Sequence, residues 1–331
     1  MICIIGSETT KSYGLFDDLS QLPDYRIVYT KPPFLYGTFL RKTVWRIRWH
    51  ILRIKEVHMA WEKSIIYNLN LLDRIVVIDT ALRWLELSFL NKCRELKPGL
   101  IIDLFFLNST ESWTFHEPVL KSKYKAFQWS SIMTFDPHDA EKNNWTCLGM
   151  HYYSKHKLST SRKMDTDLFF AGSISGQRGE RLLHLLQCFN ANDVKCKYIC
   201  PSLGWRHYLS KQPKGMRLIW KRIPYKRILK KMLGSNCILE VLQEGQGASS
   251  LRYLEAVCYN KKLLTTNPEI TKYPFYDERY MKVFSTEADI DYDWVKKVEP
   301  IDYGYNNEFS PSGLFQNLAS VRRDHTSYDR H

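Results

Sequence analysis

Residues 236–267 constrain the fold of this chain more than any other stretch. Apolar residues predict a buried strand over 237–242 and a second strand over 263–265. A glycine-containing loop follows the first strand, and Ser249 and Ser250 then suit the start of a helix. A strand, a loop, a helix and a second strand in this order predict a crossover unit of an α/β domain with a parallel sheet.

The start of this helix also predicts a site for an anion. Backbone N–H groups at a helix N-terminus have no partner within the helix, so they suit a diphosphate. Arg252 and Glu255 are three residues apart and share one helix face. The arginine would hold a second phosphate oxygen, and the glutamate would hold the hydroxyl groups of a ribose. The alternative is an ordinary crossover with a surface ion pair.

The order Q-G-x-S-x-x-R-x-x-E-A at 246–256, followed by K-K-L-L-T-T-N, resembles the donor-site segment of a known family. These are bacterial surface-polysaccharide glycosyltransferases of the GT-B fold, which build lipopolysaccharide and capsule. The resemblance implies an α/β chain with two Rossmann-like domains facing across a cleft. It also implies a nucleotide-sugar donor and a glycan or lipid-linked glycan acceptor. It continues at 101–110, 134–145, 167–186 and 222–240.

The spacing of the glutamates departs from the commonest pattern of that fold. There, two glutamates lie eight residues apart around E-G-x-G, whereas Glu244 and Glu255 are eleven apart in this chain. Glu244 therefore does not inherit the role of the first glutamate.

Ligands of open α/β sheets bind beyond the carboxyl ends of the strands, so candidate residues are those that follow strands. Gly172 and Arg178 follow a predicted strand over 167–172, although they also fit a plain turn and a solvated helix position. The resemblance adds Tyr225, in a segment that contacts the nucleobase region in that family. The residues that we expect to bind the nucleotide sugar are Gly172, Arg178, Tyr225, Gln246, Gly247, Ser249, Ser250, Arg252 and Glu255.

An inverting transferase needs a general base near the donor, either a carboxylate or a histidine, to accept the proton of the acceptor hydroxyl. Asp79 is the first candidate, because it ends a strand predicted over 74–80. It also fits the N-cap of a helix predicted over 81–96. A retaining enzyme needs no such base, and Glu240 near the donor then gains interest. The other candidates for the base are Asp17, Asp136 and His138.

The length of 331 residues predicts two domains, each long enough for its own core. Strands and helices alternate in both halves, as in parallel sheets covered on both faces. A basic stretch without periodicity over 151–166 predicts a linker. We expect an acceptor-binding domain over 1–155, a nucleotide-sugar-binding domain over 156–310, and a C-terminal helix and tail over 311–331.

Apolar periodicity and turn residues place the individual elements. The predicted strands cover 2–5, 26–29, 74–80, 100–108, part of 125–134, 167–172, 194–200, 237–242, 263–265 and 281–286. The predicted helices cover 38–63, 81–96, 180–192, 225–233, 249–259 and 313–321.

The charge and the cysteine content limit which partners and which cellular compartment suit the chain. Lys and Arg outnumber Asp and Glu by 48 to 35, and the net charge of +13 indicates an anionic partner. The 8 cysteines are scattered, which favours small buried side chains in a reducing compartment. Cys196 and Cys200 lack a second pair at zinc-site spacing, so we expect no metal site and no cofactor. Neither a signal peptide nor a membrane-spanning run is visible, which favours a cytoplasmic protein.

The stretch 38–63 bears on where the protein acts. Its apolar residues recur at helical spacing, and Trp45, Trp49, arginines and lysines stand between them. A basic helix with tryptophans suits an anionic membrane surface, so we expect peripheral contact with the inner leaflet of the inner membrane. A core helix whose charged face meets water fits the stretch equally well.

Several functions compete at this stage. The leading one is a metal-independent glycosyltransferase that moves a sugar from a nucleotide sugar to a hydroxyl of a lipopolysaccharide, O-antigen or capsule. A nucleotide-sugar-modifying enzyme such as an epimerase is the first alternative, because fold alone does not separate the two. A basic protein that binds nucleic acid or anionic lipid is another, and an inactive partner with the same fold is the last. No recognised RNA or DNA module is visible, so we expect no nucleic-acid partner.

Overall fold

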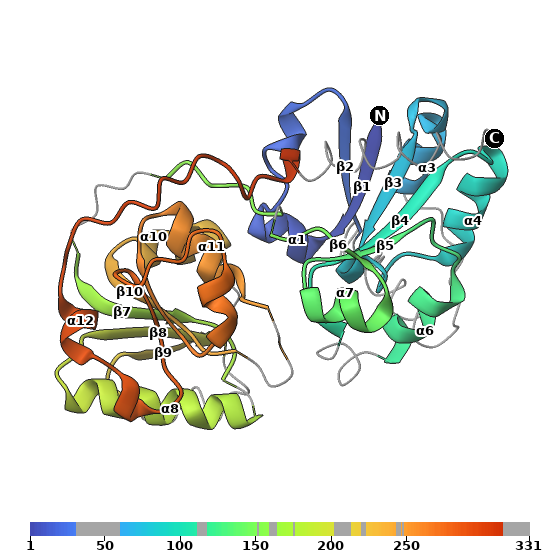
Figure 1. The fold of residues 1–331 in the computed structure, drawn as a ribbon. Coiled ribbons are helices and arrows are strands. Elements are labelled where there is room, and N and C mark those ends of the chain that lie inside the picture. Colours follow the sequence, from blue (N-terminus) through green and yellow to red (C-terminus); the bar gives the residue numbers. More distant parts are fainter. Residues whose placement is uncertain are drawn as a thin grey trace, which may run out of the picture. The chain divides into compact units, whose positions relative to one another are not determined.

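The computed structural model divides into two compact units, Met1–Ser154 with the chain from Ser310 onward, and Lys155–Phe309 (Figure 1). Each unit is built on its own parallel sheet and is described by itself. The residues that the structure describes are 1–30, 60–110, 118–150, 152–158, 164–174, 176–201, 213–219, 223–242, 246 and 248–313.

The first unit contains a 6-stranded sheet of order β2-β1-β3-β4-β5-β6 in which all neighbouring strands are parallel. Its direction of strand addition reverses between β1 and β3. The strands are β1 Ile2–Ser7, β2 Tyr25–Thr30, β3 Arg74–Ile78, β4 Ile101–Phe106, β5 Ile132–Thr134 and β6 Thr146–Cys147. The helices are α1 Glu8–Tyr13, α3 Ala60–Tyr67, α4 Leu87–Leu96, α6 Pro118–Ala126 and α7 Pro137–Asn143.

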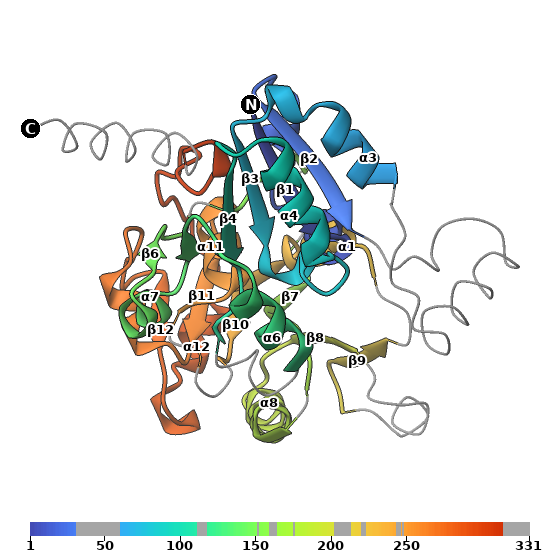
Figure 2. The ribbon, with the colours of Figure 1, turned by 90° about the vertical axis from the view of Figure 1, so that its right-hand side faces the viewer.

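Both faces of this sheet are covered, which explains its nearly continuous apolar strands. Figure 2 shows α3 and α4 in front of one face. Ile102, Leu104 and Phe106 of β4 belong to the core on that side, together with residues of α3 and α4. Phe105 points to the other face, where its ring contacts Tyr152 with 6.5 Å between centroids.

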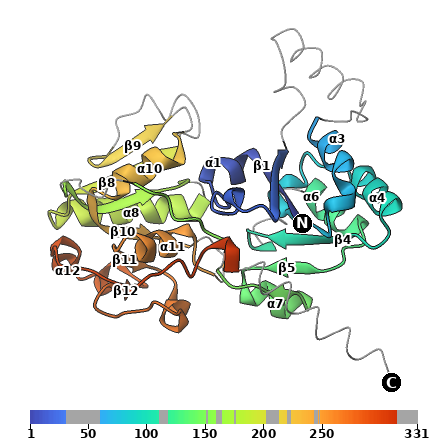
Figure 3. The same cartoon turned by 90° about the horizontal axis from the view of Figure 1, so that it is seen from above.

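The second unit contains a 6-stranded parallel sheet of order β12-β11-β10-β7-β8-β9. Figure 3 follows this order from β9 to β12. The strands are β7 Thr166–Ala171, β8 Cys196–Pro201, β9 Met216–Ile219, β10 Ser235–Glu240, β11 Lys262–Thr265 and β12 Met281–Val283. The helices are α8 Gly176–Ala191, α10 Tyr225–Met232, α11 Leu251–Cys258 and α12 Tyr292–Lys296.

Counted from its first strand, the second sheet has the 3-2-1-4-5-6 order of a dinucleotide-binding Rossmann sheet. Residues of α8 and α12 form the core on one face, and α10 and α11 cover the other (Figure 1). The predicted α/β class with two Rossmann-like domains is therefore confirmed. The described residues contain no helix with the length and apolarity needed to cross a membrane.

The sequence placed most of the central elements correctly and missed short or polar ones. It missed β6 and β9, whose residues are too few or too polar to stand out, and the helices α6, α7 and α12. Helix α4 begins at Leu87 and not at 81, because a 3-10 turn occupies Asp79–Ala81. Helix α8 begins at Gly176 and not at 180. The predicted helices over 38–63 and 313–321 lie mostly outside the described residues.

Lys261 and Lys262 begin the K-K-L-L-T-T-N run after α11, and both donate to backbone carbonyls. The Nζ atom of Lys261 donates to the carbonyls of Leu233 and Ser235, at 2.9 and 2.7 Å. Lys262 has no exposed surface and donates to the carbonyls of Trp294 and Lys297, at 2.9 and 2.7 Å. Its Nζ also lies 2.6 Å from a carboxylate oxygen of Glu299. Lys262 therefore holds the segment that follows α12 against β11.

We expect Lys262→Met to lower the free energy of unfolding by about 3 kcal/mol, because it removes the charged donor of the Trp294 carbonyl and one of two donors each from the Lys297 carbonyl and the Glu299 carboxylate. Urea denaturation followed by circular dichroism measures this change. Lys296→Met is the matched control, since its partner Asp293 is 92% exposed, and it should change the free energy by about 0.5 kcal/mol or less. Equal stability of the Lys262→Met variant and the wild type would contradict this account.

Candidate functional site

The strand order of the second sheet reverses between β7 and β10, and the carboxyl ends of these two strands define the candidate site. Open α/β sheets bind ligands at such a reversal. Gly172 follows β7, Arg178 lies in the first turn of α8, and Glu240 ends β10. The helix α11 begins beyond Glu240 and carries Arg252. Gly172, Arg178 and Arg252, three of the predicted donor residues, therefore lie at one edge of one sheet.

Glycines let α8 and its arginine approach the end of β7. A Cβ atom on Gly179 would lie 2.2 Å from the carbonyl oxygen of Ile174, so only glycine permits this approach. A Cβ atom on Gly172 would lie 3.0 Å from the Phe170 ring and 3.5 Å from Nη2 of Arg178. The Arg178 guanidinium also lies 5.6 Å from the centre of the Phe170 ring. The sequence predicted a helix only from 180 onward, whereas Gly179 already lies in α8, in close contact with Ile174.

Arg178 is held in an environment that suits an anionic ligand. Burial and the neighbouring charge of Arg252 lower the pKa of Arg178, while Glu240 opposes that shift. The Nε atom of Arg178 is buried and has no hydrogen-bond partner among the described residues. A buried N–H of a guanidinium without an acceptor is costly, and an added anion would satisfy it.

Arg252, Glu255 and Tyr225 form a buried group beside Arg178. Nη1 of Arg252 donates to Oε2 of Glu255, and the hydroxyl of Tyr225 donates to Oε1 at 2.5 Å. Glu255 has no exposed surface, and Tyr225 is 3% exposed. Burial raises the pKa of Glu255, and the contacts with Arg252 and Tyr225 oppose that rise. The alternative of a surface ion pair is therefore wrong, because Arg252 and Glu255 form an interior pair with a third member from α10.

Glu240 organises the first residues of α11. Its Oε1 accepts hydrogen bonds from the N–H and the hydroxyl of Ser250, at 2.8 and 2.7 Å. Its Oε2 accepts from the hydroxyls of Ser249 and Thr265, at 3.1 and 2.7 Å. The hydroxyl of Ser250 in turn accepts from the N–H of Arg252, so Ser250 is the N-cap of α11, as predicted.

The structure corrects the expectation of free N–H groups at the start of α11. The N–H of Ser250 donates to Glu240, and the N–H of Ser249 donates to the hydroxyl of Tyr273 at 3.0 Å. A phosphate would have to displace these acceptors before it could bind there. The two guanidinium groups are therefore the better-placed anion ligands at this edge.

Sequence reasoning missed the partners that fix this loop. Thr265, Asn267 and Tyr273 are among them, and the Asn267 side chain donates to the hydroxyl of Ser249 at 2.9 Å. The polar T-T-N run over 265–267, which begins at the last residue of β11, was the sequence feature that could have indicated them. Gln246 donates to the carbonyl of Ala248 at 2.8 Å, while Gly247 and Glu244 lie outside the described residues. The donor role of each predicted residue stays a prediction.

The first sheet carries polar residues at its own carboxyl edge, including Asp79. The carboxylate of Asp79 is fully buried. It accepts hydrogen bonds from the Asn108 side chain at 2.8 Å and from the N–H groups of Thr80, Leu107 and Asn108. A carboxylate has about four lone-pair sites, so an acceptor hydroxyl would have to replace one of these donors. The role of Asp79 as general base stays a prediction.

The rival bases lie in different surroundings. Asp17 and His138 are exposed, whereas Asp136 is buried. Asp136 caps α7 by accepting from the N–H of His138 at 3.0 Å. Burial, then the nearby Asp139, raises the pKa of Asp136. Its second oxygen has no partner among the described residues.

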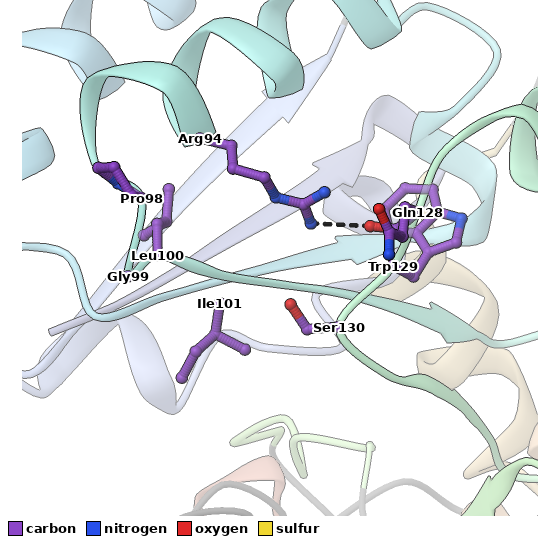
Figure 4. A pocket seen from close by; sticks show the side chains of 8 residues that line it. All are labelled: Arg94, Pro98, Gly99, Leu100, Ile101, Gln128, Trp129 and Ser130. Atoms are coloured by element: carbon purple, nitrogen blue, oxygen red, sulfur yellow. Dashed lines mark hydrogen bonds between the residues drawn. The ribbon is translucent and has the colours of Figure 1, made fainter.

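A surface hollow of about 380 Å³ lies at the opposite, amino edge of the first sheet, beside the start of β4 (Figure 4). Arg94 crosses it and donates to the carbonyl of Gln128 at 2.7 Å. None of the predicted site residues lines it, and we assign it no part in the site. Its lining residues are Arg94, Pro98, Gly99, Leu100, Ile101, Gln128, Trp129 and Ser130.

No protein-family model and no curated protein sequence matches the chain. Similar solved structures include the glycosyltransferase SnogD from Streptomyces nogalater, 12% identical over 80% of this chain and 81% of that one, with a TM-score of 0.35. Another is apo UGT2 from Phytolacca americana, 10% identical over 89% and 88%, with a TM-score of 0.42. A protein from Listeria monocytogenes assigned as a UDP-N-acetylglucosamine 2-epimerase is 10% identical over 99% and 97%, with a TM-score of 0.45. At these values the likeness carries no functional argument.

The surroundings of Asp79 predict a pH dependence of stability. Burial raises the pKa of Asp79 from 3.8 to about 6, so the folded state favours the protonated acid. The stabilisation that results from this shift is complete below the pKa of Asp79 in the unfolded state. It is lost as the pH rises through about 6, which lowers the free energy of unfolding by about 3 kcal/mol. Asp79→Asn should abolish this loss, which urea denaturation between about pH 4 and about pH 7 would measure.

The exposed Asp24 in the same unit supplies the control for this experiment. Asp24→Asn should show the wild-type pH dependence. A stability difference between Asp79→Asn and the wild type that is constant with pH would contradict the predicted shift.

Proposed function

We propose that the chain is a glycosyltransferase that uses a nucleotide-sugar donor and a hydroxyl group as acceptor. The bond between the anomeric carbon and the phosphate oxygen breaks, and a bond to the acceptor oxygen forms. The nucleotide leaves, and the acceptor proton passes to a base or to the leaving phosphate. The observation that carries the proposal is the pair of guanidinium groups, Arg178 and Arg252, at the strand reversal of the second sheet.

Two adjacent arginines suit the departing group of this reaction. Negative charge develops on the phosphate oxygens as the glycosidic bond breaks, and guanidinium groups stabilise it with paired hydrogen bonds. They supply this charge without a metal ion, so the proposed reaction is metal-independent. In the described residues, no three His, Cys, Asp or Glu side chains gather as a metal site would need.

The acceptor and the place of action are proposed from the sequence. The resemblance over 246–256 supports a hydroxyl of a lipopolysaccharide, O-antigen or capsule glycan, free or lipid-linked. We propose that the first unit binds this acceptor and that Asp79 is its general base. The tryptophans and basic residues over 38–63 support peripheral contact with the inner face of the inner membrane, in the cytoplasm.

A nucleotide panel tests the donor site first. UDP, GDP, ADP and their sugar conjugates are added with EDTA, and the unfolding temperature is followed. A ligand at a hundred times its Kd adds about 2.7 kcal/mol of stability. We expect one nucleotide family to stabilise the protein and EDTA to have no effect. Stabilisation by none of them would remove the proposed function.

The same nucleotide sugar then tests the reaction. Release of nucleoside diphosphate only after addition of lipopolysaccharide core oligosaccharide supports a transferase. Conversion of the nucleotide sugar to an isomer without any acceptor would instead establish the epimerase alternative.

Arg178→Gln should weaken binding of the nucleoside diphosphate about tenfold or more, because it removes a charge-assisted hydrogen bond. Binding of the corresponding nucleoside should not change, and calorimetry measures both. Arg181→Gln is the control, since Arg181 lies in the same helix, is exposed and donates to the carbonyl of Ser285. Unchanged diphosphate affinity in Arg178→Gln would exclude this arginine from the site.

A further inference from the structure

The carboxylate of Glu255 is occupied on both sides by protein donors. Oε1 accepts the hydroxyl of Tyr225 at 2.5 Å, and Oε2 accepts Nη1 of Arg252. The side chain has no exposed surface. A carboxylate has about four lone-pair sites, so these oxygens keep acceptor capacity, but a ribose diol would have to enter the interior to reach it.

Tyr225, one of the two neighbours of Glu255, is itself held in place. Tyr225 opens α10, is almost fully buried, and lies edge-on to the His156 ring at 5.6 Å between centroids. The backbone of His156 is fixed by the hydroxyl of Tyr259, which accepts from its N–H at 3.0 Å and donates to its carbonyl at 3.2 Å. Glu255 of α11 is therefore held by Tyr225 of α10 on one side and by Arg252 of its own helix on the other.

Arg252 is the member of this group that reaches toward solvent, with 13% of its side chain exposed. It lies close enough to Arg178 for the two charges to oppose each other. A long arginine side chain beside a like charge would turn away unless it were held. The contact with Glu255 uses Nη1, one of three guanidinium nitrogens that carry five N–H donors in total.

We propose that Glu255 is a positioning residue that orients Arg252 toward the donor phosphates, and that it is not the ribose ligand. The inference rests on the proposed function, because it assumes that Arg252 meets a nucleotide phosphate. Glu255 fixes the guanidinium before the ligand arrives and offsets its repulsion from Arg178. Preordering of this kind strengthens binding because less side-chain freedom is lost.

A double-mutant cycle with matched ligands tests the inference. The variants are Glu255→Gln, Arg252→Lys and the double variant. UDP, GDP and ADP are compared first, and the nucleoside diphosphate that binds most tightly is chosen. Its nucleoside and the 2′-deoxy and 3′-deoxy forms of the diphosphate are then measured with every variant. Calorimetry gives the Kd of each pair.

The positioning role predicts a defined pattern. Glu255→Gln weakens the nucleoside diphosphate about tenfold and leaves the nucleoside unchanged. The ratio of affinities between ribose and deoxyribose forms stays at its wild-type value. The double variant binds about as weakly as the worse single variant, because both changes remove the same interaction.

Tyr225→Phe separates positioning from general damage to the fold. It removes the Tyr225 hydrogen bond to Glu255 and keeps the contact between Glu255 and Arg252, so it should weaken diphosphate binding in the same direction and by less. Glu269→Gln is the matched control, since Glu269 forms an exposed pair with Lys272 at the same three-residue spacing. This control should bind every ligand as the wild type does.

The opposite pattern would overturn the inference. If Glu255 held the ribose, Glu255→Gln would bring the ratio of ribose to deoxyribose affinities close to one. The effects of Glu255→Gln and Arg252→Lys on the binding free energy of the diphosphate would then add. Failure of the wild type to bind any of the three diphosphates would instead reject the proposed function.

Discussion

The buried carboxylate of Glu240 is the interaction on which the candidate site depends. It ends β10 and accepts hydrogen bonds from Ser249, Ser250 and Thr265. A carboxylate buried in this way is costly unless donors surround it, so Ser249 and Ser250 are held against the ends of β10 and β11. The start of α11 and the direction of Arg252 follow from this arrangement.

Electrostatic balance is the second constraint at this edge. Arg178 and Arg252 oppose each other, while Glu240 and Glu255 each offset one of them. The four formal charges cancel, so two cations are held close together at a reduced cost. A phosphate bound as proposed would meet guanidinium groups already largely withdrawn from water, where each charge-assisted hydrogen bond is stronger.

The sequence predictions were accurate where the signal lay within a few neighbouring residues, and less accurate where an element depends on distant parts of the chain. The crossover over 236–267 was placed within about two residues, because an apolar run and a hydroxyl N-cap are local features. β6 and β9 were missed because short strands at a sheet edge carry little apolar pattern. The start of α8 was misplaced because glycine suggested a loop, whereas Gly179 serves a close approach to Ile174.

The sequence by itself determined the α/β class and the crossover around α11, and it supplied the arginines that we propose to bind a phosphate. Only the tertiary structure decided the strand orders, and with them that Arg178 and Arg252 meet at one edge. It also decided that Glu255 faces Tyr225 and that the N–H groups of Ser249 and Ser250 have protein acceptors. The physical reason is distance along the chain. The partners of Glu255 and Glu240 come from separate elements, and which elements become neighbours depends on the packing of the whole sheet.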